Sequence, residues 1–200
     1  MPVLVYNSKE GITMDNIKKT IIIGVLAVLV IFGVYFYSYK QSAPRETNNF
    51  VGAVNYKDAT YIIEGQKVAL KNGIAETESA PGSSSKIITR YFGNETTADF
   101  DGDGREDIAF LLTQDTGGSG TFYYVVAALN TKNGYVGSKA LFIGDRIAPQ
   151  VTEKGSGNGI IVNYADRAPG ESFAVKPSIG KSLRLVFDVG EMQFGEIVPE

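Results

Sequence analysis

The 200-residue sequence contains no cysteine and no histidine. Without cysteine, the chain can form no disulfide, no thiolate nucleophile, no lipid-modified cysteine and no zinc–thiolate site. Without histidine, it lacks the commonest general base and the commonest protein ligand of transition metals. Because these two absences remove most known catalytic constellations, we expect a protein that is not an enzyme.

An excess of positive charge is also missing. The chain has 19 basic and 22 acidic residues, which gives a formal net charge of −3. A protein that follows a nucleic-acid backbone needs a stripe of lysine and arginine, and no such stripe is present. We therefore expect no nucleic-acid partner.

One long apolar run lies near the N-terminus. Residues 20–39, TIIIGVLAVLVIFGVYFYSY, contain no charged residue and are flanked by lysines on both sides. A helix of this length spans about 30 Å, the thickness of a hydrocarbon core. Its last turns carry tyrosines, which favour the membrane–water interface. We predict a transmembrane helix over residues 20–39, after a short tail (1–19) and before a polar juxtamembrane stalk (40–49).

A cleaved signal peptide is the alternative interpretation of this run. The run is longer than a typical signal-peptide core, and Pro44 is a poor neighbour for a cleavage site. We therefore favour an uncleaved anchor in the cell membrane, with the large C-terminal part, residues 50–200, outside the cytoplasm. Met14 is an alternative start to Met1.

Residues 50–200 alternate short β-rich runs with turn signals and show no sustained helical period. We predict an all-β domain of about eight to ten strands, either an antiparallel sandwich or a partly closed barrel. Hairpin turns are expected at residues 64–66 and 72–73. Further strands are expected at residues 86–92, 160–164, 172–176, 183–188 and 193–198.

The most apolar part of this domain lies in its centre. Residues 108–112 and 122–129 are nonpolar at consecutive positions. A strand with this pattern is covered on both faces. With residues 135–144, these two runs predict a three-strand meander.

The stretch TADFDGDGREDIAFLL, residues 97–112, places aspartates at relative positions 1, 3, 5 and 9 and a glycine at position 6. Alternate carboxylates in a curling loop can point to one centre, and the glycine permits the bend that closes the loop. Oxygen ligands without nitrogen or sulfur select Ca²⁺, and less well Mg²⁺ or Mn²⁺. The predicted ligands are Asp99, Asp101, Asp103, the carbonyl of Arg105 and Asp107.

An EF-hand would require a bidentate glutamate at position 12, where this chain has Phe110. The D-x-D-x-D-G-x-x-D spacing that runs directly into IAFLL instead resembles the calcium loop of FG-GAP repeats, which occur in the propeller blades of integrin α-chains. The resemblance covers residues 97–112 only. It implies a Ca²⁺ loop between two antiparallel strands, and with a single copy it does not imply a propeller.

The order of the segments is similar to that of uncharacterised, single-pass, membrane-anchored envelope proteins of candidate-phylum bacteria. The segments that carry this likeness are the anchor, ATYIIEG, the acidic loop, GGSGTFYYVVAALN and VNYADRAPGESFAVKPS. The likeness implies an extracytoplasmic envelope domain and brings no known activity.

The resulting hypothesis is a membrane-anchored, calcium-binding β domain with a structural or binding role, whose partner is an envelope protein or a glycan. Two alternatives stay open. The first is a carboxylate-based cell-wall hydrolase, which needs two carboxyl groups across a cleft, for which Asp145, Asp166 and Glu171 are available. The second is a small anchored inhibitor or ligand carrier.

Overall fold

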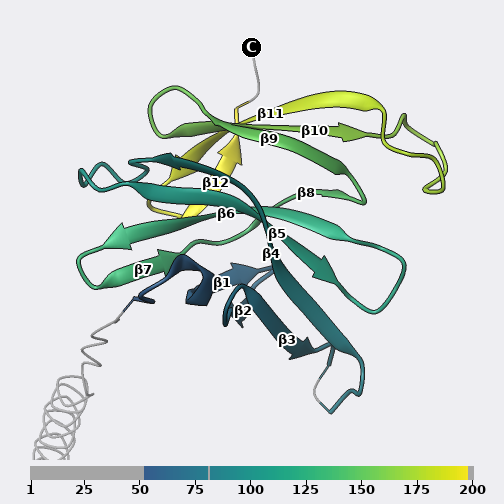
Figure 1. The fold of residues 1–200 in the computed structure, drawn as a ribbon, viewed down its shortest axis with the longest axis horizontal. Helices are drawn as coiled ribbons and strands as arrows, with labels where there is room; N and C mark the ends of the chain where they lie inside the picture. Colours follow the sequence, from purple (N-terminus) through teal and green to yellow (C-terminus); the bar gives the residue numbers. More distant parts are fainter. Residues whose placement is uncertain (1–51, 81, 198–200) are drawn as a thin grey trace, which may run out of the picture. The chain divides into compact units, whose positions relative to one another are not determined.

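The computed structural model describes residues 52–80 and 82–197 (Figure 1). The predicted tail, transmembrane helix and stalk, residues 1–49, lie outside these described residues. Within the described part, no helix has both the length and the apolar character needed to cross a membrane.

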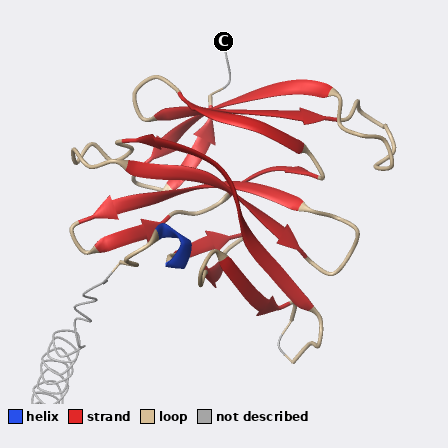
Figure 2. Ribbon diagram, viewed as in Figure 1, coloured by secondary structure: helices blue, strands red, loops and turns tan. Residues whose placement is uncertain are grey.

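Almost all regular structure in the described residues is β (Figure 2). One short 3-10 helix precedes twelve strands. The elements are η1 (Tyr56–Asp58), β1 (Thr60–Ile63), β2 (Gln66–Ala69), β3 (Ile74–Glu78), β4 (Lys86–Ala98), β5 (Asp107–Asp115), β6 (Phe122–Thr131), β7 (Gly134–Gly137), β8 (Leu141–Asp145), β9 (Ala148–Lys154), β10 (Gly159–Asp166), β11 (Ile179–Asp188) and β12 (Gln193–Glu196).

The strands form three antiparallel sheets. A central sheet has the order β3-β4-β5-β6-β7. Strand β7 pairs with the C-terminal part of β6, and β8 pairs with the N-terminal part. A second sheet has the order β12-β11-β10-β9, and β1 and β2 form a hairpin of their own. The predicted all-β, antiparallel fold is confirmed, and none of these described sheets closes into a barrel.

The two middle strands of the central sheet, β5 and β6, are buried on both faces, as the apolar runs predicted. On one face, alternate residues such as Leu111 and Val125 pack with the four-stranded sheet in one hydrophobic cluster. On the other face, their chain neighbours Leu112 and Val126 pack with the β1–β2 hairpin in a second cluster. Because successive side chains of a strand point to opposite faces, the consecutive apolar positions of β5 and β6 supply both cores.

Two tight turns position the hairpin. Glu64 and Gly65, with φ of 48° and 79°, connect β1 to β2. Asn72 and Gly73, with φ of 52° and 79°, lie between β2 and β3. Positive φ at both central residues is the type I′ geometry that suits a two-residue hairpin loop, so both predicted turns are confirmed.

Three strand predictions need correction. The strand expected at residues 86–92 does not end at Gly93 but continues to Ala98, with register shifts on both sides of Gly93 that absorb its turn-like backbone. The third strand of the meander is divided into β7 and β8. Ser138 between them still bonds to Ala127 of β6, but the carbonyl of Ser138 and the N–H of Ala140 bond to Ile62 of β1.

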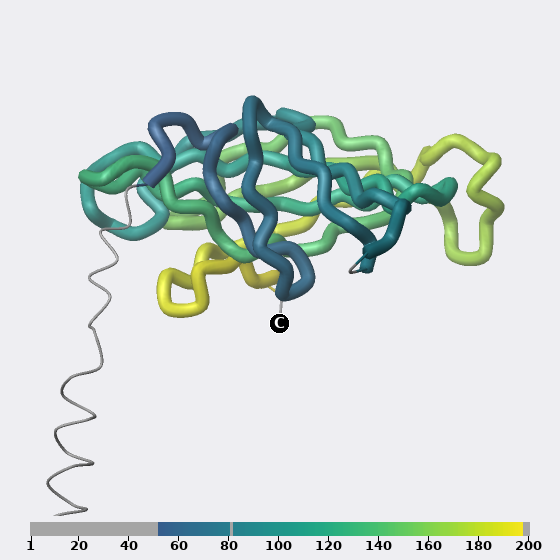
Figure 3. The backbone as a smooth tube through the Cα atoms, turned by 90° about the horizontal axis from the view of Figure 1, so that it is seen from below, coloured from purple at the N-terminus to yellow at the C-terminus, as the bar shows by residue number. Residues whose placement is uncertain are grey.

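Residues 172–176 were expected to form a strand, and this is wrong. They belong to the long β10–β11 connection, which Figure 3 shows projecting from one end of the domain. The guanidinium of Arg167 donates to the carbonyls of Phe173 and Val175 and holds these residues in a loop. Strand β9 was not predicted, since only Thr152 in it is buried and its apolar residues do not alternate.

Candidate metal site

The predicted ligands lie in the connection between β4 and β5, which we call the acidic turn (residues 99–107). Ala98 and Asp107 are paired across the two antiparallel strands, so the turn is a hairpin connection. Gly102 and Gly104 have φ of 79° and 84°. Only glycine adopts such a backbone without steric cost, so the predicted need for a glycine at position 6 is met by Gly104.

Three of the four aspartates converge. One carboxylate oxygen from each of Asp99, Asp101 and Asp107 lies within 4.8 Å of the others. Asp99 is exposed, Asp101 is half-buried and Asp107 is fully buried. The cluster therefore runs from the protein interior to solvent and can be reached by an ion from outside.

Asp107 is the interior member of the cluster. Its Oδ2 accepts a hydrogen bond from the backbone N–H of Phe100 at 2.8 Å, and its Oδ1 accepts one from Asn130 N–H at 2.7 Å. Burial raises the pKa of Asp107, these two N–H donors lower it, and the nearby charges of Asp101 and Asp99 raise it again. A cation beside the three carboxylates would favour the ionised form of Asp107.

Asp99 organises the backbone of the turn. Its Oδ1 accepts from the N–H groups of Gly102 and Asp103, at 2.8 and 3.1 Å, and its Oδ2 accepts from Gly104 N–H at 3.0 Å. Asp101 Oδ1 also accepts from Asp103 N–H at 3.1 Å. These N–H groups offset part of the negative charge and hold the carboxylates in place, which leaves further lone pairs for a cation.

Asp103 was predicted to be a ligand, but it is not part of the cluster. Its carboxylate pairs with the guanidinium of Arg105, and its Oδ1 accepts from Arg105 N–H at 2.9 Å. The Nε of Arg105 donates to the carbonyl of Asn130 on β6. The side chain of Arg105 thus ties the acidic turn to β6, a role that the sequence did not indicate.

Asn130 is a second residue that sequence reasoning missed. Its N–H bonds Asp107 and its carbonyl accepts from Arg105. Both interactions use backbone atoms of a residue 23 positions away from Asp107, so no side-chain pattern could have revealed them.

The other carboxylates considered from the sequence are engaged in local contacts. Asp145 pairs with Arg146 at 2.6 Å and accepts from Thr121 N–H. Asp166 pairs with Lys181 at 2.7 Å. Glu171 accepts from Ala168 N–H within the β10–β11 connection.

The donor set of the acidic turn is compatible with a metal ion. It consists of carboxylate oxygens, with no nitrogen or sulfur donor, which is the preference of hard divalent cations. Comparisons of the chain with protein-family models, with characterised proteins and with solved structures found no match. The case for a function therefore depends on the residues of this chain alone.

Proposed function

We propose that this protein is a membrane-anchored, extracytoplasmic β domain that binds Ca²⁺ in its acidic turn and acts as a non-enzymatic structural or binding component of the cell envelope. The observation that carries the proposal is the convergence of Asp99, Asp101 and Asp107 within 4.8 Å, with Asp107 fully buried. The predicted anchor over residues 20–39 and the resemblance to the FG-GAP loop support it.

The bound ion would stabilise the fold by joining the ends of β4 and β5. Asp99 directly follows β4, whereas Asp107 begins β5 and also bonds β6 through Asn130. A cation shared by these carboxylates would remove their mutual repulsion and connect three strands of the central sheet. Ca²⁺ is preferred over Mg²⁺, since it accepts irregular cages of oxygens, whereas Mg²⁺ demands near-ideal octahedral geometry.

Thermal unfolding tests the metal proposal. The full chain in a non-ionic detergent would be heated with Ca²⁺, with Mg²⁺ or with a chelator. An ion that binds only the folded state adds about 2.7 kcal/mol of stability at a hundredfold excess over its Kd, so Tm should rise with Ca²⁺ concentration. Asp101→Asn should abolish the rise, whereas Asp188→Asn, outside the acidic turn, should retain it. Superimposable curves under all three conditions would refute the calcium site.

Membrane attachment is tested separately. The full chain should stay with the membrane pellet after alkaline carbonate extraction. A variant that lacks residues 20–39 should move to the supernatant. Retention of that variant in the pellet would show that the predicted helix is not the anchor.

A further inference from the structure

Three tyrosines surround the buried ring of Phe110 on the face of the central sheet that the β1–β2 hairpin covers, which we call the hairpin side. The three, Tyr56, Tyr61 and Tyr91, have ring centroids 5.4–5.5 Å from that ring. Tyr61 is fully buried, and its hydroxyl donates to a backbone carbonyl. Tyr56 and Tyr91 are only half-buried, and both hydroxyls donate to one carboxylate oxygen, Oε1 of Glu95. The two accessible phenols thus share a single acceptor.

The shared acceptor brings the two phenols together at their hydroxyl ends. The ring centroids of Tyr56 and Tyr91 are 6.3 Å apart, and the ring planes are tilted by 60°. Because both hydroxyls reach the same oxygen atom, the hydroxyl groups lie closer together than the ring centres do. The ortho carbons of each ring are next to its hydroxyl. These are the carbons at which two oxidised phenols join.

The backbone holds the two tyrosines in this arrangement. The N–H of Gly73 donates to the carbonyl of Lys57, the neighbour of Tyr56, at 2.8 Å. The carbonyl of Gly73 accepts from Tyr91 N–H at 2.7 Å. A Cβ atom at Gly73 would lie 3.0 Å from the Cβ of Tyr91, so glycine permits the close approach. Tyr56 of η1 and Tyr91 of β4 are therefore held side by side although they are distant in the chain.

Glu95 is ionised and the two phenols are protonated at neutral pH. Burial raises the pKa of Glu95, but the hydrogen bonds from the two phenols and the charge of Lys57 lower it below its ordinary value. Burial and the hydrogen bond to Glu95 raise the pKa of Tyr56 to about 12, and they also raise that of Tyr91. Removal of an electron makes a phenol strongly acidic, and Glu95 is placed to accept the released proton. Because Glu95 is exposed, it can pass each proton to solvent.

The composition of the chain directs oxidation to tyrosine. The chain has 11 tyrosines and no cysteine or tryptophan. Cysteine and tryptophan are the side chains that compete best with tyrosine for one-electron oxidants, so a radical formed in this chain settles on a tyrosine. Without cysteine, no disulfide can fasten one part of the fold to another. A bond between two tyrosines is the oxidative cross-link that this composition permits.

We propose that Tyr56 and Tyr91 are a site of oxidative modification, at which a dityrosine cross-link joins η1 to β4 and Glu95 accepts the protons. Each phenol loses one electron to a peroxide-derived oxidant and one proton to Glu95. The two phenoxyl radicals form a carbon–carbon bond between ortho positions, and the two ortho hydrogens move to the phenol oxygens. In sum, the protein loses two hydrogen atoms, and one hydrogen peroxide is reduced to two waters.

The cross-link fastens the hairpin side to the central sheet. It closes a loop from residue 56 to residue 91, which contains β1, β2 and β3. A closed loop of this length removes conformations from the unfolded chain, as a disulfide does. The Tm of the cross-linked protein should therefore lie about 5–10 °C above that of the unmodified protein. An oxidant would thus make this fold more stable.

The test uses the full chain at low concentration in a non-ionic detergent, with hydrogen peroxide and a peroxidase. Digestion with trypsin should give a linked pair of peptides, residues 46–57 and 91–105. The mass of this pair should be two hydrogen atoms below the sum of the two peptides. The pair should come from monomeric protein, together with dityrosine fluorescence and the rise in Tm.

Substitutions of tyrosine test which residues are joined. Tyr91→Phe should remove the linked peptides and the rise in Tm, and Tyr56→Phe provides a second test if Tyr91→Phe does not fold. Tyr135→Phe is the matched control, because the ring of Tyr135 lies 5.7 Å from that of Tyr56. Among the described residues, however, only Tyr56 and Tyr91 donate to Glu95. The control should therefore keep both the linked peptides and the rise in Tm.

Glu95→Gln tests the proton acceptor. Glutamine keeps an oxygen that accepts hydrogen bonds from the phenols, but it takes up no proton at neutral pH. In a dilute buffer the linked peptides should therefore form at least about tenfold more slowly. Glu153→Gln, on β9 of the other sheet, should leave the rate unchanged.

Three results would overturn the proposal: no linked peptides, a main link from Tyr56 to Tyr135, or cross-links found only in covalent dimers. An equal rate in Glu95→Gln and the parent would overturn the role of Glu95 as the proton acceptor. The acidic turn takes no part in the reaction, so a chelator should leave the yield of linked peptides unchanged. Failure of the calcium proposal is thereby distinguishable from failure of this one.

Discussion

The two faces of the central sheet are covered in different ways. A four-stranded sheet covers one face, and its core contains Phe100, Phe187 and Phe194, whose ring centroids lie 5.1–5.8 Å apart. The other face is covered by the β1–β2 hairpin and η1, and here Phe110 is surrounded by the rings of three tyrosines at 5.4–5.5 Å. The same two strands, β5 and β6, are thus covered by a wide, four-stranded sheet on one face and by a narrow, two-stranded hairpin on the other.

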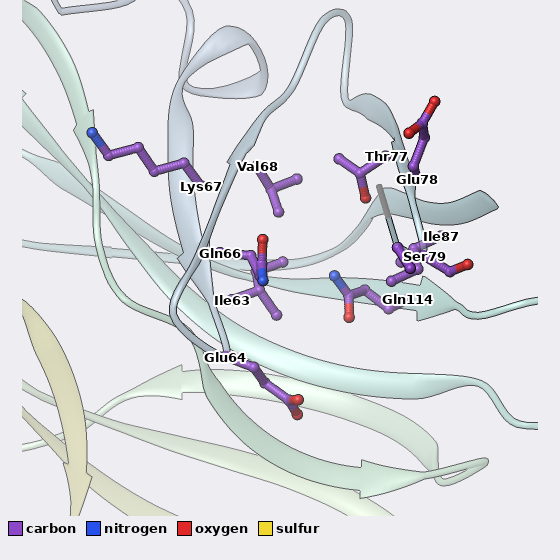
Figure 4. A pocket seen from close by; sticks show the side chains of 11 residues that line it. Ile63, Glu64, Gln66, Lys67, Val68, Thr77, Glu78, Ser79, Ile87 and Gln114 are labelled. Atoms are coloured by element: carbon purple, nitrogen blue, oxygen red, sulfur yellow. The ribbon is translucent and has the colours of Figure 1, made fainter. Parts of the chain in front are cut away.

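The difference shows how a narrow hairpin can cover one face of the sheet. Tyrosines lie at the margins of the hairpin, where their rings pack inward and their hydroxyls donate to polar partners. Tyr61 donates to the carbonyl of Tyr56 at 2.7 Å, and both Tyr56 and Tyr91 donate to Glu95. The cover ends at the gap between β2 and β3, where Gln114 of β5 lines an open cavity (Figure 4).

The largest expected effects come from the two cores. Leu111 and Leu112 are adjacent in β5, point to opposite faces and are both fully buried. Leu111→Ala and Leu112→Ala should each lower the free energy of unfolding by about 2–5 kcal/mol, measured by chemical denaturation. Val151→Ala, at a residue that is 47% exposed, should change it by less than about 0.5 kcal/mol. A negligible cost for Leu112→Ala alone would show that the hairpin does not pack on the sheet in solution.

The acidic turn should give the next largest effect. Asp107→Asn replaces a buried carboxylate that accepts two backbone N–H groups, and its amide group would leave one of those donors without an acceptor. The free energy of unfolding should fall by about 1–3 kcal/mol in the presence of chelator. On the calcium proposal, Asp99→Asn should also abolish the Ca²⁺-dependent rise in Tm, whereas Asp103→Asn should reduce it less, because Asp103 pairs with Arg105. An equal loss in both variants would place Asp103 among the ligands.

Alkaline pH should weaken the hairpin side. Burial and the hydrogen bond to Glu95 raise the pKa of Tyr56 from 10.0 to about 12, and burial likewise raises the pKa of Tyr61 and Tyr91. A group with a raised pKa stabilises the fold fully below its unfolded value and loses this contribution as pH rises through the folded value. Tm should therefore fall steadily above pH 10, followed together with tyrosinate absorbance. Tyr56→Phe should flatten this decline, and an unaltered slope would contradict the assignment.

The smallest effect is expected where β10 ends and β11 begins. The hydrogen bond from Lys181 lowers the pKa of Asp166, so the ion pair contributes above the ordinary pKa of 3.8 and is lost as pH falls through the depressed value. Because the pair is partly exposed, Lys181→Ala should cost about 0–1 kcal/mol at pH 7. Urea denaturation should show no difference between variant and parent near pH 2. A cost above 2 kcal/mol at pH 7 would indicate a structural role for Lys181 beyond the ion pair.

Local signals in the sequence predicted most of the fold. The apolar runs within β5 and β6 and the two type I′ turns are encoded by consecutive residues, so they could be recognised. Strand β9 could not be, since it is an edge strand with Pro149 and mostly exposed positions, and it forms only because β10 offers a partner. The segment 172–176 has a composition typical of a strand, yet the carbonyls of Phe173 and Val175 accept hydrogen bonds from the guanidinium of Arg167.

The candidate site was predictable to a similar degree. The spacing of Asp99, Asp101 and Asp107 was sufficient to predict their convergence, because all three lie on one tight turn. The orientation of Asp103 was not predictable. It depends on Arg105, which is itself fixed by the carbonyl of Asn130 on a neighbouring strand.

The docking of the β1–β2 hairpin has a consequence for the order of folding. The hairpin is synthesised first, yet the surface it covers comes from β5 and β6, and the segment that pins Ile62 is residues 138–140. Tyr61, Ile63 and Val68 must therefore stay without their final neighbours until some seventy-five further residues have left the ribosome. A chaperone would meet this hairpin as an apolar segment, well before the sheet that covers it has formed.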